Sequence, residues 1–272
     1  MGLACFGATG ETGTSILPQK DRMFAELLDT DLLLLSLAVL VAGVVRGFAG
    51  FGTGMIAGPV AAALYGPQVG LPLLFVIDTW PMLPLLPAAW RKANFGEIVP
   101  LLAGYACLVP LGLWFLKTGD QTLLRWFISL AVLSLVAVLA SGWRYEGSRT
   151  RPVSLGVGAV SGFLGGSIGV NGPPVILYWM ALRTGAGFVR ANILVFFAFT
   201  NVIGGVGLWF AGLWTAKALI LGAIASPVYL IGLLAGARMF GLASEETYRR
   251  IAFAVILTAA IVSMPLLDGV LR

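Results

Sequence analysis

Long apolar runs, separated by short polar or glycine-rich breaks, follow one another from Asp31 to the end of the chain. A hydrocarbon core about 30 Å thick needs about 20 apolar residues in a helix, and most of these runs approach that length. Because the hydrocarbon core holds no water to satisfy the backbone, such uniform runs are helices rather than alternating barrel strands. The pattern predicts ten hydrophobic segments: 32–48, 54–65, 69–89, 98–116, 121–142, 153–167, 171–183, 187–212, 215–238 and 248–270.

Composition agrees with a membrane location. Of the 272 residues 59% are hydrophobic and only 11% are charged, with a mean hydropathy of +0.96, whereas a soluble domain carries about 25% charged residues. The net charge of +5 arises from basic residues in the gaps between segments, where membrane orientation explains them and no nucleic-acid partner is needed. We therefore predict an all-α polytopic protein whose main surroundings are the lipid bilayer.

One polar stretch divides the chain. Residues 143–152 form the only substantial mid-chain linker, with five hydrophobic segments before it and five after it. The predicted organisation is an N-terminal tail (1–30), a first membrane repeat (31–142), a cytoplasmic linker (143–152) and a second membrane repeat (153–272). The tail lacks the charged and apolar regions of a signal peptide, and we assign it no function.

Basic residues are distributed unevenly if successive segments alternate sides. One face would collect Arg91, Lys92, Arg144, Arg149, Arg151, Arg183, Arg190, Arg238, Arg249 and Arg250, and the other would collect Lys20, Arg22, Lys117, Arg125, Lys217 and Arg272. The positive-inside rule places the richer face in the cytoplasm. Both termini are then expected in the periplasm of a bacterial inner-membrane protein.

The two halves share a pattern at a spacing of 115 residues. Gly47-Phe-Ala-Gly50 corresponds to Gly162-Phe-Leu-Gly165, Gly54 to Gly169, and Pro59-Val60 to Pro174-Val175. An odd number of segments per half reverses the second copy relative to the first, as in the inverted repeats of many secondary transporters. Whether segments 32–65 and 153–183 cross fully or are re-entrant is left open, because either arrangement returns the chain to the same side.

Glycine clusters interrupt the first segment pair of each half, at residues 46–55 and 161–174, and a short helix of roughly 12 residues follows each cluster. Such a helix rises about 18 Å, too little to span the bilayer. Its unpaired N–H groups and positive dipole end would suit an anion at the midplane. The residues expected to bind this anion are Arg46, Gly50, Gly52, Thr53, Gly54, Gly166, Ser167, Gly169, Asn171, Gly172 and Asn201.

Close helix packing is the alternative explanation for the glycines. Gly50 and Gly54, Gly158 and Gly162, and other pairs four residues apart form small-xxx-small patterns, which usually mark helices in contact. The repetition of the two breaks, each with added polar residues, favours a substrate site.

Two polar side chains within the segments are candidates for chemistry beyond packing. Asp78 lies near the centre of segment 69–89 and is either a proton-coupling carboxylate or the partner of Arg46 in a structural ion pair. Arg46 suits an oxyanion, with snorkelling to the interface as its alternative. When the midpoints of the segments are superposed, Thr200-Asn201 falls opposite Asp78-Thr79, and hydrogen bonding between helices is an equally ordinary role for Asn201. Arg190 is most simply explained by membrane orientation.

The second glycine break, Gly162-Phe-Leu-Gly-Gly-Ser-Ile-Gly-Val-Asn-Gly-Pro-Pro174, and its shorter first copy resemble the sulfite exporter TauE/SafE family over nearly all of residues 30–270. The resemblance implies export or exchange of sulfite, sulfoacetate or another small organic anion in bacteria, coupled to protons or another ion. The first copy departs from the second, because Phe51 replaces the second glycine of the pair and no Asn-Gly-Pro-Pro follows. The two half-sites are therefore not expected to be equivalent.

Other function classes have less support. The chain has no histidine and two cysteines, Cys5 and Cys107, neither at a break, so we expect no enzyme activity, no metal site and no cofactor. A narrow anion channel of the same fold remains the alternative to a transporter, since it would use the same glycine N–H groups. The partners expected are a small anion and lipid, and a homodimer is left open.

Overall fold

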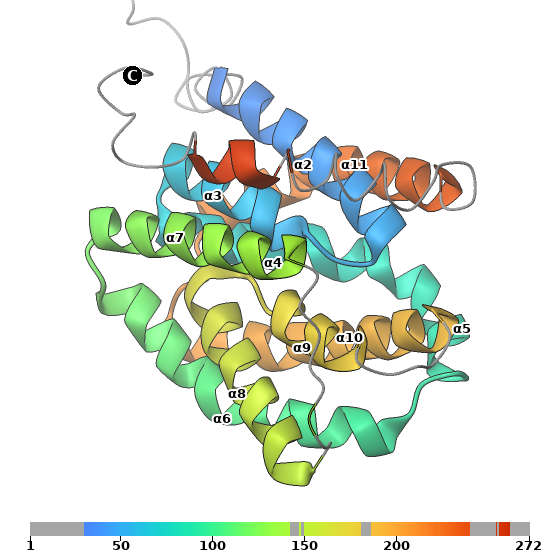
Figure 1. The fold of residues 1–272 in the computed structure, drawn as a ribbon. Helices are drawn as coiled ribbons and strands as arrows, with labels where there is room; N and C mark the ends of the chain where they lie inside the picture. The colour runs from blue at the N-terminus through green and yellow to red at the C-terminus, as the bar shows by residue number, and fades with distance from the viewer. Residues whose placement is uncertain are drawn as a thin grey trace, which may run out of the picture. The chain divides into compact units, whose positions relative to one another are not determined.

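The computed structural model describes residues 30–141, 147, 150–180, 186–239, 254 and 256–261, and within them the regular structure is helical with no strand. Figure 1 shows the helices α2 (Thr30–Ala49), α3 (Thr53–Tyr65), α4 (Pro67–Thr79), η1 (Trp80–Leu85), α5 (Leu86–Trp90), α6 (Phe95–Thr118), α7 (Gln121–Ala140), α8 (Arg151–Ile168), α9 (Gly172–Met180), α10 (Ala186–Ala211) and α11 (Ala216–Met239). The tail before Thr30, most of the linker 143–152 and most of segment 248–270 lie outside the described residues.

Five of these helices are long and apolar enough to cross a membrane: Thr30–Phe48, Phe95–Thr118, Gln121–Ala140, Gly187–Ala211 and Ala216–Met239. Helix α3, with 13 residues, is shorter. The prediction of an all-α chain with several membrane-spanning helices is confirmed for the described residues.

Polar caps mark the starts of two helices. Helix α6 begins at Phe95 rather than at residue 98, because the side chain of Asn94 accepts a hydrogen bond from the N–H of Gly96 at 3.0 Å. At the next turn, Asp120 accepts from the N–H groups of Thr122 and Leu123 and starts α7. Such caps satisfy N–H groups that have no partner within the helix.

The single segment expected over 69–89 is broken into three pieces in the structure. The α-helix α4 ends at Thr79, a 3₁₀ helix runs through the Trp-Pro-Met-Leu-Pro-Leu stretch, and α5 resumes at Leu86. Pro81 and Pro84 have no N–H to continue an α-helical ladder, which accounts for the change of helix type. Asp78 therefore lies in the last turn of α4, next to this change.

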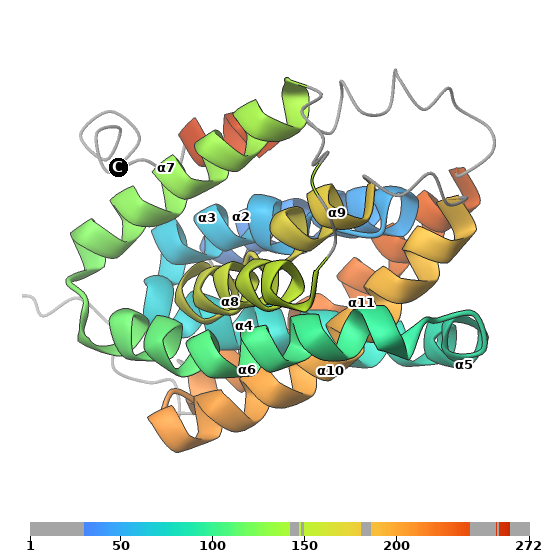
Figure 2. The same cartoon turned by 60° about the horizontal axis from the view of Figure 1, so that its bottom comes forward.

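Helices α6 and α8 come from different halves of the chain and pack through glycine, as both views show them side by side (Figures 1 and 2). The backbone of Gly104 on α6 lies against the carbonyl oxygen of Leu155, and Gly158 on α8 lies against that of Leu101. A Cβ atom at either glycine would overlap the facing carbonyl. Packing is therefore the role of these small-xxx-small glycines.

Helices α2 and α11 pack in the same manner. Gly43 on α2 lies against the carbonyl of Tyr229, while Gly232 on α11 lies against that of Leu40. Both interfaces join the first segment of one half to the fourth segment of the other half.

Large apolar side chains remain exposed on the outer helices, among them Trp209 (74%) and Phe210 (85%) on α10 and Trp114 (61%) on α6. A protein in water would bury most such side chains, whereas contact with lipid costs nothing. The buried core instead contains aromatic residues such as Tyr105, Trp179 and Phe196, whose rings meet edge to face.

Candidate functional site

The first glycine break reverses the chain between α2 and α3. Gly50 and Gly52 have φ angles of 82° and 117°, in the left-handed region where a side chain is strained. Gly52 is the N-cap of α3 and provides no side-chain cap, and its carbonyl accepts from the N–H groups of Met55 and Ile56. The first N–H groups of α3, from Thr53 and Gly54, have no partner within the helix.

The second break lies between α8 and α9. Helix α8 continues to Ile168 and ends at Gly169, which has a φ angle of 73° and donates its N–H to the carbonyl of Gly165. After Val170 and Asn171, α9 begins at Gly172 and continues with Pro173 and Pro174. Because prolines carry no N–H, this break offers fewer backbone donors than the first.

The two breaks touch each other. The backbone of Gly54 lies against the carbonyl oxygen of Gly169, in a position where a Cβ atom on Gly54 would overlap that oxygen. Segments separated by 115 residues thus form one site.

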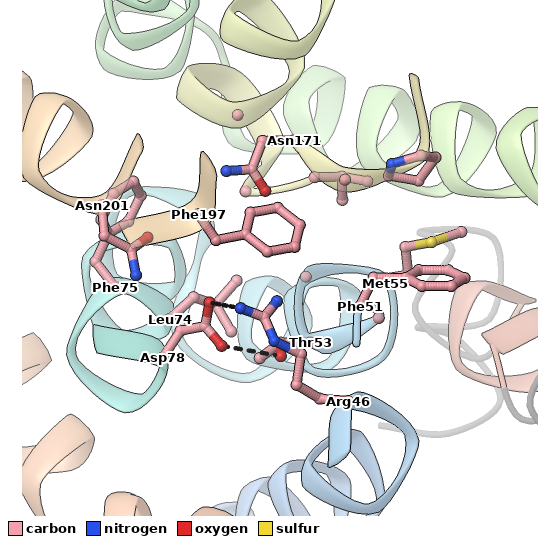
Figure 3. Close-up of a pocket in the computed structure, with 17 residues that line it drawn as sticks. Arg46, Phe51, Thr53, Met55, Leu74, Phe75, Asp78, Asn171, Phe197 and Asn201 are labelled. Atoms are coloured by element: carbon pink, nitrogen blue, oxygen red, sulfur yellow. Dashed lines mark hydrogen bonds and ion pairs between the residues drawn. The ribbon is translucent and has the colours of Figure 1, made fainter. Parts of the chain in front are cut away.

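A cavity of about 40 Å³ lies between the breaks (Figure 3). One water needs roughly 10–15 Å³ of such space, so the cavity has room for a small ion. Its lining comes from α2, α3, α4, α10 and both breaks: Arg46, Phe51, Gly52, Thr53, Gly54, Met55, Leu74, Phe75, Asp78, Gly165, Gly169, Val170, Asn171, Gly172, Pro173, Phe197 and Asn201.

Most of the residues expected at the site line this central cavity: Arg46, Gly52, Thr53, Gly54, Asp78, Gly169, Asn171, Gly172 and Asn201. Gly50 lines a neighbouring cavity instead. Gly166 and Ser167 line neither cavity, since Gly166 lies against the carbonyl of Val109 on α6 and the Ser167 hydroxyl donates to the carbonyl of Phe163. Both belong to a regular turn of α8, because the chain leaves the helix only at Gly169.

Arg46 and Asp78 form an ion pair at the cavity wall, with Nη2 of Arg46 2.9 Å from Oδ2 of Asp78 (Figure 3). The Arg46 side chain is 6% exposed and that of Asp78 is 15% exposed. The Arg46 guanidinium also lies 4.4 Å from the ring centroid of Phe197 and donates to the sulfur of Met82 at 3.7 Å. Of the alternatives for Arg46, the structure shows burial in an ion pair rather than snorkelling.

The second oxygen of Asp78 is held by hydroxyl groups. Oδ1 accepts from the Tyr229 hydroxyl at 2.6 Å and from the Thr53 hydroxyl at 3.2 Å, and these two hydroxyls lie 2.8 Å apart. Both oxygens of Asp78 are therefore engaged, and an anion that binds Arg46 in this cavity has to compete with the carboxylate for the guanidinium.

Two asparagines line the opposite side. Nδ2 of Asn171 donates to the Thr200 hydroxyl at 2.9 Å, and the backbone carbonyl of Asn171 accepts from Ser161. Nδ2 of Asn201 is buried and has no hydrogen-bond partner among the described residues. A buried donor without a partner is costly, so this amide is available to an acceptor that enters the cavity.

Sequence reasoning missed three residues near the site. Tyr229 holds Asp78, Phe197 lies against Arg46, and Arg190 lines the neighbouring cavity rather than serving orientation alone. A phenol in the middle of an apolar segment was the available signal for Tyr229. Nothing in the pattern distinguishes Phe197 from other aromatic residues in the spans.

Comparison with known proteins identifies the family of the chain. A family model described as sulfite exporter TauE/SafE matches residues 35–264. A protein of Cupriavidus necator named "Probable sulfite/organosulfonate exporter TauE" is 30% identical over 222 residues, which cover 76% of this chain and 84% of that protein. No solved structure matches the chain. The chain therefore belongs to the sulfite exporter TauE/SafE family of membrane transporters.

Proposed function

We propose that this protein is a secondary transporter that exports a small sulfur oxyanion or organosulfonate, such as sulfite or sulfoacetate, across the bacterial inner membrane. The observation that carries the proposal is that the two glycine breaks meet around one small cavity with Arg46 in its wall. The name of the Cupriavidus necator relative supports the substrate class.

The cavity offers complementary groups to a sulfo or sulfite headgroup. Arg46 supplies the positive charge, and the first turn of α3 supplies backbone N–H groups. Asn201 supplies an amide donor that has no partner among the residues the structure describes. The apolar side chains of Leu74 and Phe75 limit the water around these donors, which strengthens each interaction. The volume suits the headgroup alone, so a larger organic part requires the cavity to open.

Proton coupling follows from the competition at Arg46. While Asp78 is ionised it occupies the guanidinium of Arg46. Protonation of Asp78 removes that competitor and lets the anion take its place, so a proton and an anion bind together. The groups that face this carboxyl are Arg46 from α2, Thr53 from α3 and Tyr229 from α11, with Arg190 of α10 lining the adjoining cavity.

Alternating access around a midplane site is the proposed mechanism, based on two inverted repeats. Gly43 and Gly158, and likewise Gly47 and Gly162, are 115 positions apart, and each pair packs its helix on the fourth segment of the other half. Reciprocal contacts of this kind are expected when two similar units are related by a two-fold axis. Contact between the equivalent Gly54 and Gly169 supports an axis through the cavity.

The distribution of basic residues supports an orientation with the starts of α6 and α10 towards the cytoplasm. The N–H of Asn94 donates to Oδ1 of Asn192 at 2.7 Å, which places Arg91 and Lys92 near the end of the bundle that carries Arg190. At the opposite end, Nζ of Lys117 donates to the carbonyl of Ala211 at 2.7 Å. Figure 2 shows these two ends on opposite sides of the bundle. In this orientation both termini are periplasmic.

The test is counterflow in proteoliposomes loaded with unlabelled sulfite or sulfoacetate. Saturable accumulation of labelled substrate is expected from the wild type, and Arg46→Gln is expected to reduce it by roughly tenfold or more, as for loss of a charge-assisted hydrogen bond. Arg151→Gln, the same change at an exposed residue on α8, is the matched control and should transport normally.

Two results would contradict the proposal. Counterflow that is absent with both substrates would remove the assigned substrate class. Anion flux without stimulation by substrate on the other side would indicate a channel rather than a transporter.

A further inference from the structure

A large apolar groove lies between α4 and α10, the third segments of the two halves of the chain. Its volume is about 450 Å³, within the range of about 300–1,000 Å³ that is usual for sites that bind small organic molecules. We call this space the lateral groove. Its lining consists of Phe75, Val76, Thr79, Asn201, Val202, Gly205, Val206, Trp209 and Trp214.

The side of α10 that lines the lateral groove is exposed and apolar. Val202 is 63% exposed, Val206 is 52% exposed and Trp209 is 74% exposed, on a helix long enough to cross the membrane. Among the described residues the lining includes no charged side chain. The groove therefore favours an apolar occupant, whereas an ion would lose its water without gaining a counter-charge.

The polar groups of the lateral groove are mostly engaged within the protein. The Thr79 hydroxyl donates to the carbonyl of Phe75 at 2.6 Å, and Nε1 of Trp214 donates to the carbonyl of Gly205 at 3.1 Å. Nδ2 of Asn201 is buried and has no partner in the described part of the chain. The amide of Asn201 is therefore a donor available to a ligand, and it lies where the groove meets the central cavity.

Phe75 and Asn201 are the residues of the described part that line both the central cavity and the lateral groove (Figure 3). Phe75 comes from α4 and Asn201 from α10. The Phe75 ring lies against the backbone of Gly204, where a Cβ atom would overlap the ring. The partition between the two spaces is therefore made of side chains, which move more readily than a packed helix.

The two spaces offer complementary environments. The central cavity has the guanidinium of Arg46 and backbone donors, but its volume of about 40 Å³ admits a headgroup alone. The lateral groove has room and an apolar lining but no counter-charge. An organosulfonate with a compact anionic head and an apolar tail needs both environments, side by side.

We propose that the lateral groove binds the apolar tail of an alkanesulfonate whose headgroup occupies the central cavity. The Phe75 ring moves aside to admit the tail, and the Asn201 amide donates to the sulfonate where the two spaces meet. The position of the headgroup rests on the proposed function. The groove adds a preference within that substrate class, because sulfonates with a tail of several carbons bind more tightly than methanesulfonate.

The test measures equilibrium binding of methanesulfonate, butanesulfonate and hexanesulfonate to the purified protein in lipid nanodiscs, by isothermal titration calorimetry. The heat measured with empty nanodiscs is subtracted, because longer tails also partition into lipid. We expect the dissociation constant to fall by roughly two- to fourfold for each added methylene group, the scale of removing that group from water. Hexyltrimethylammonium, which has the same tail on a cationic head, should show no saturable binding.

Gly205→Leu fills the lateral groove, since a Cβ atom there would meet only Trp214, at 4.0 Å. We expect this variant to bind hexanesulfonate at least tenfold more weakly, by roughly the loss of two or more buried methylene groups, and to retain its affinity for methanesulfonate. The matched control is Gly156→Leu, at an exposed residue of α8 with no described atom within 4 Å of a Cβ, which should keep the full dependence on tail length. Val206→Trp narrows the groove from its exposed side and provides the same comparison if Gly205→Leu does not fold.

Four results would overturn the proposal. They are an affinity independent of tail length, a dependence that disappears when the empty-nanodisc heat is subtracted, a dependence unchanged in both groove variants, and an equal loss of methanesulfonate and hexanesulfonate binding in those variants. The second of these would assign the groove to lipid.

Binding and counterflow separate this proposal from the proposed function. Sulfite counterflow without any dependence of binding on tail length would overturn the role of the lateral groove alone. Tail-dependent binding without counterflow of any sulfonate would overturn transport and leave the binding site. Failure of every sulfonate to bind would overturn both.

Discussion

Gly54 lies directly against the carbonyl oxygen of Gly169, so the equivalent glycines of the two chain halves are in contact. This contact closes one wall of the central cavity and sets the distance between the first turn of α3 and the second break. The space in this cavity therefore depends on the absence of a side chain at residue 54.

Gly54→Ala should disturb this contact. The added methyl group would overlap the Gly169 carbonyl, and overpacking of this kind costs about 1–3 kcal/mol. We expect a lower thermal unfolding midpoint in detergent and reduced counterflow. Gly58→Ala, one turn further along α3, is the control, because its Cβ would meet the Ile168 carbonyl at an ordinary 3.6 Å. Equal effects of the two substitutions would rule out the contact as the cause.

A substitution at Gly50 tests the effect of backbone conformation in the absence of steric overlap. The φ angle of Gly50 is 82°, and no atom of the described residues lies within 4 Å of where a Cβ would stand. Gly50→Ala should therefore destabilise the protein by about 1–2 kcal/mol through backbone strain alone. Gly156 on α8 has equally open space but no positive φ angle, and Gly156→Ala should be neutral or stabilising. Thermal unfolding of both variants, with Gly50→Asn as a tolerated left-handed residue, measures the difference. Loss of stability in Gly156→Ala but not in Gly50→Ala would contradict this account.

Much of the fold was predictable because lipid imposes a simple rule on apolar length. Helix ends agree with the expected segments where caps or glycines mark them, as at Asp120 and Gly169. The pattern failed at 69–89, where Pro81 and Pro84 change the helix type without interrupting the apolar run. Hydrophobicity reports burial in lipid, whereas helix continuity depends on backbone N–H groups.

The candidate site was predictable in part. Repetition identified the two breaks, but spacing alone does not show which glycines leave the helix. Gly166 remains helical and packs on α6, whereas Gly169 has a positive φ angle and lines the cavity. Tyr229 and Arg190 join Arg46 only through tertiary packing of α11 and α10. A single sequence can mark Tyr229 as a phenol within an apolar segment but does not show which residues it meets.

Replacing one member of the Arg46–Asp78 pair should lower the stability of the fold more than replacing both members. Asp78→Asn leaves the buried Arg46 guanidinium without its counter-charge, which should destabilise the fold by about 3–5 kcal/mol. The double variant Arg46→Met with Asp78→Leu removes both charges and leaves neither uncompensated. We expect the thermal midpoint to fall further in the single variant than in the double variant. A double variant as unstable as the single one would mean that the pair is not the source of the loss.

The pH dependence of transport follows from the same pair. If protonation of Asp78 frees Arg46, counterflow by the wild type rises as the pH falls. Asp78→Asn cannot exchange a proton, so its residual counterflow should be independent of pH. Transport measured with pH clamped equally on both sides checks this expectation. A pH dependence that persists unchanged in Asp78→Asn would assign the coupling to another group.

Tyr229→Phe should destabilise the fold, because it removes a hydrogen bond to the carboxylate of Asp78. The hydroxyl donates to Oδ1 at 2.6 Å, and its loss leaves only the longer bond from Thr53 at 3.2 Å; hydrogen bonds to charged groups contribute about 1.5–3 kcal/mol. Tyr105→Phe is the control, because the buried Tyr105 hydroxyl has no partner among the described residues and its removal should be neutral or stabilising. Thermal unfolding of the two variants compares them directly. A Tyr105→Phe variant less stable than Tyr229→Phe would show that the hydroxyl of Tyr229 does not support Asp78.

A substitution at Asn201 should affect substrate affinity and protein stability in opposite directions. Nδ2 of Asn201 is buried without a partner in the described part of the chain, so Asn201→Leu removes an unsatisfied donor and should leave stability unchanged or raised. If that donor serves the anion, the same change should raise the substrate concentration for half-maximal counterflow by about tenfold, the scale of one hydrogen bond to a charged group. Asn192→Leu is the contrasting variant. Nδ2 of Asn192 is likewise buried without a partner among the described residues, but its Oδ1 accepts from the N–H of Asn94 at 2.7 Å, and the residue lines neither cavity. It should lose stability while its substrate affinity is retained. The opposite assignment of effects, with affinity lost in Asn192→Leu and stability lost in Asn201→Leu, would remove Asn201 from the anion site.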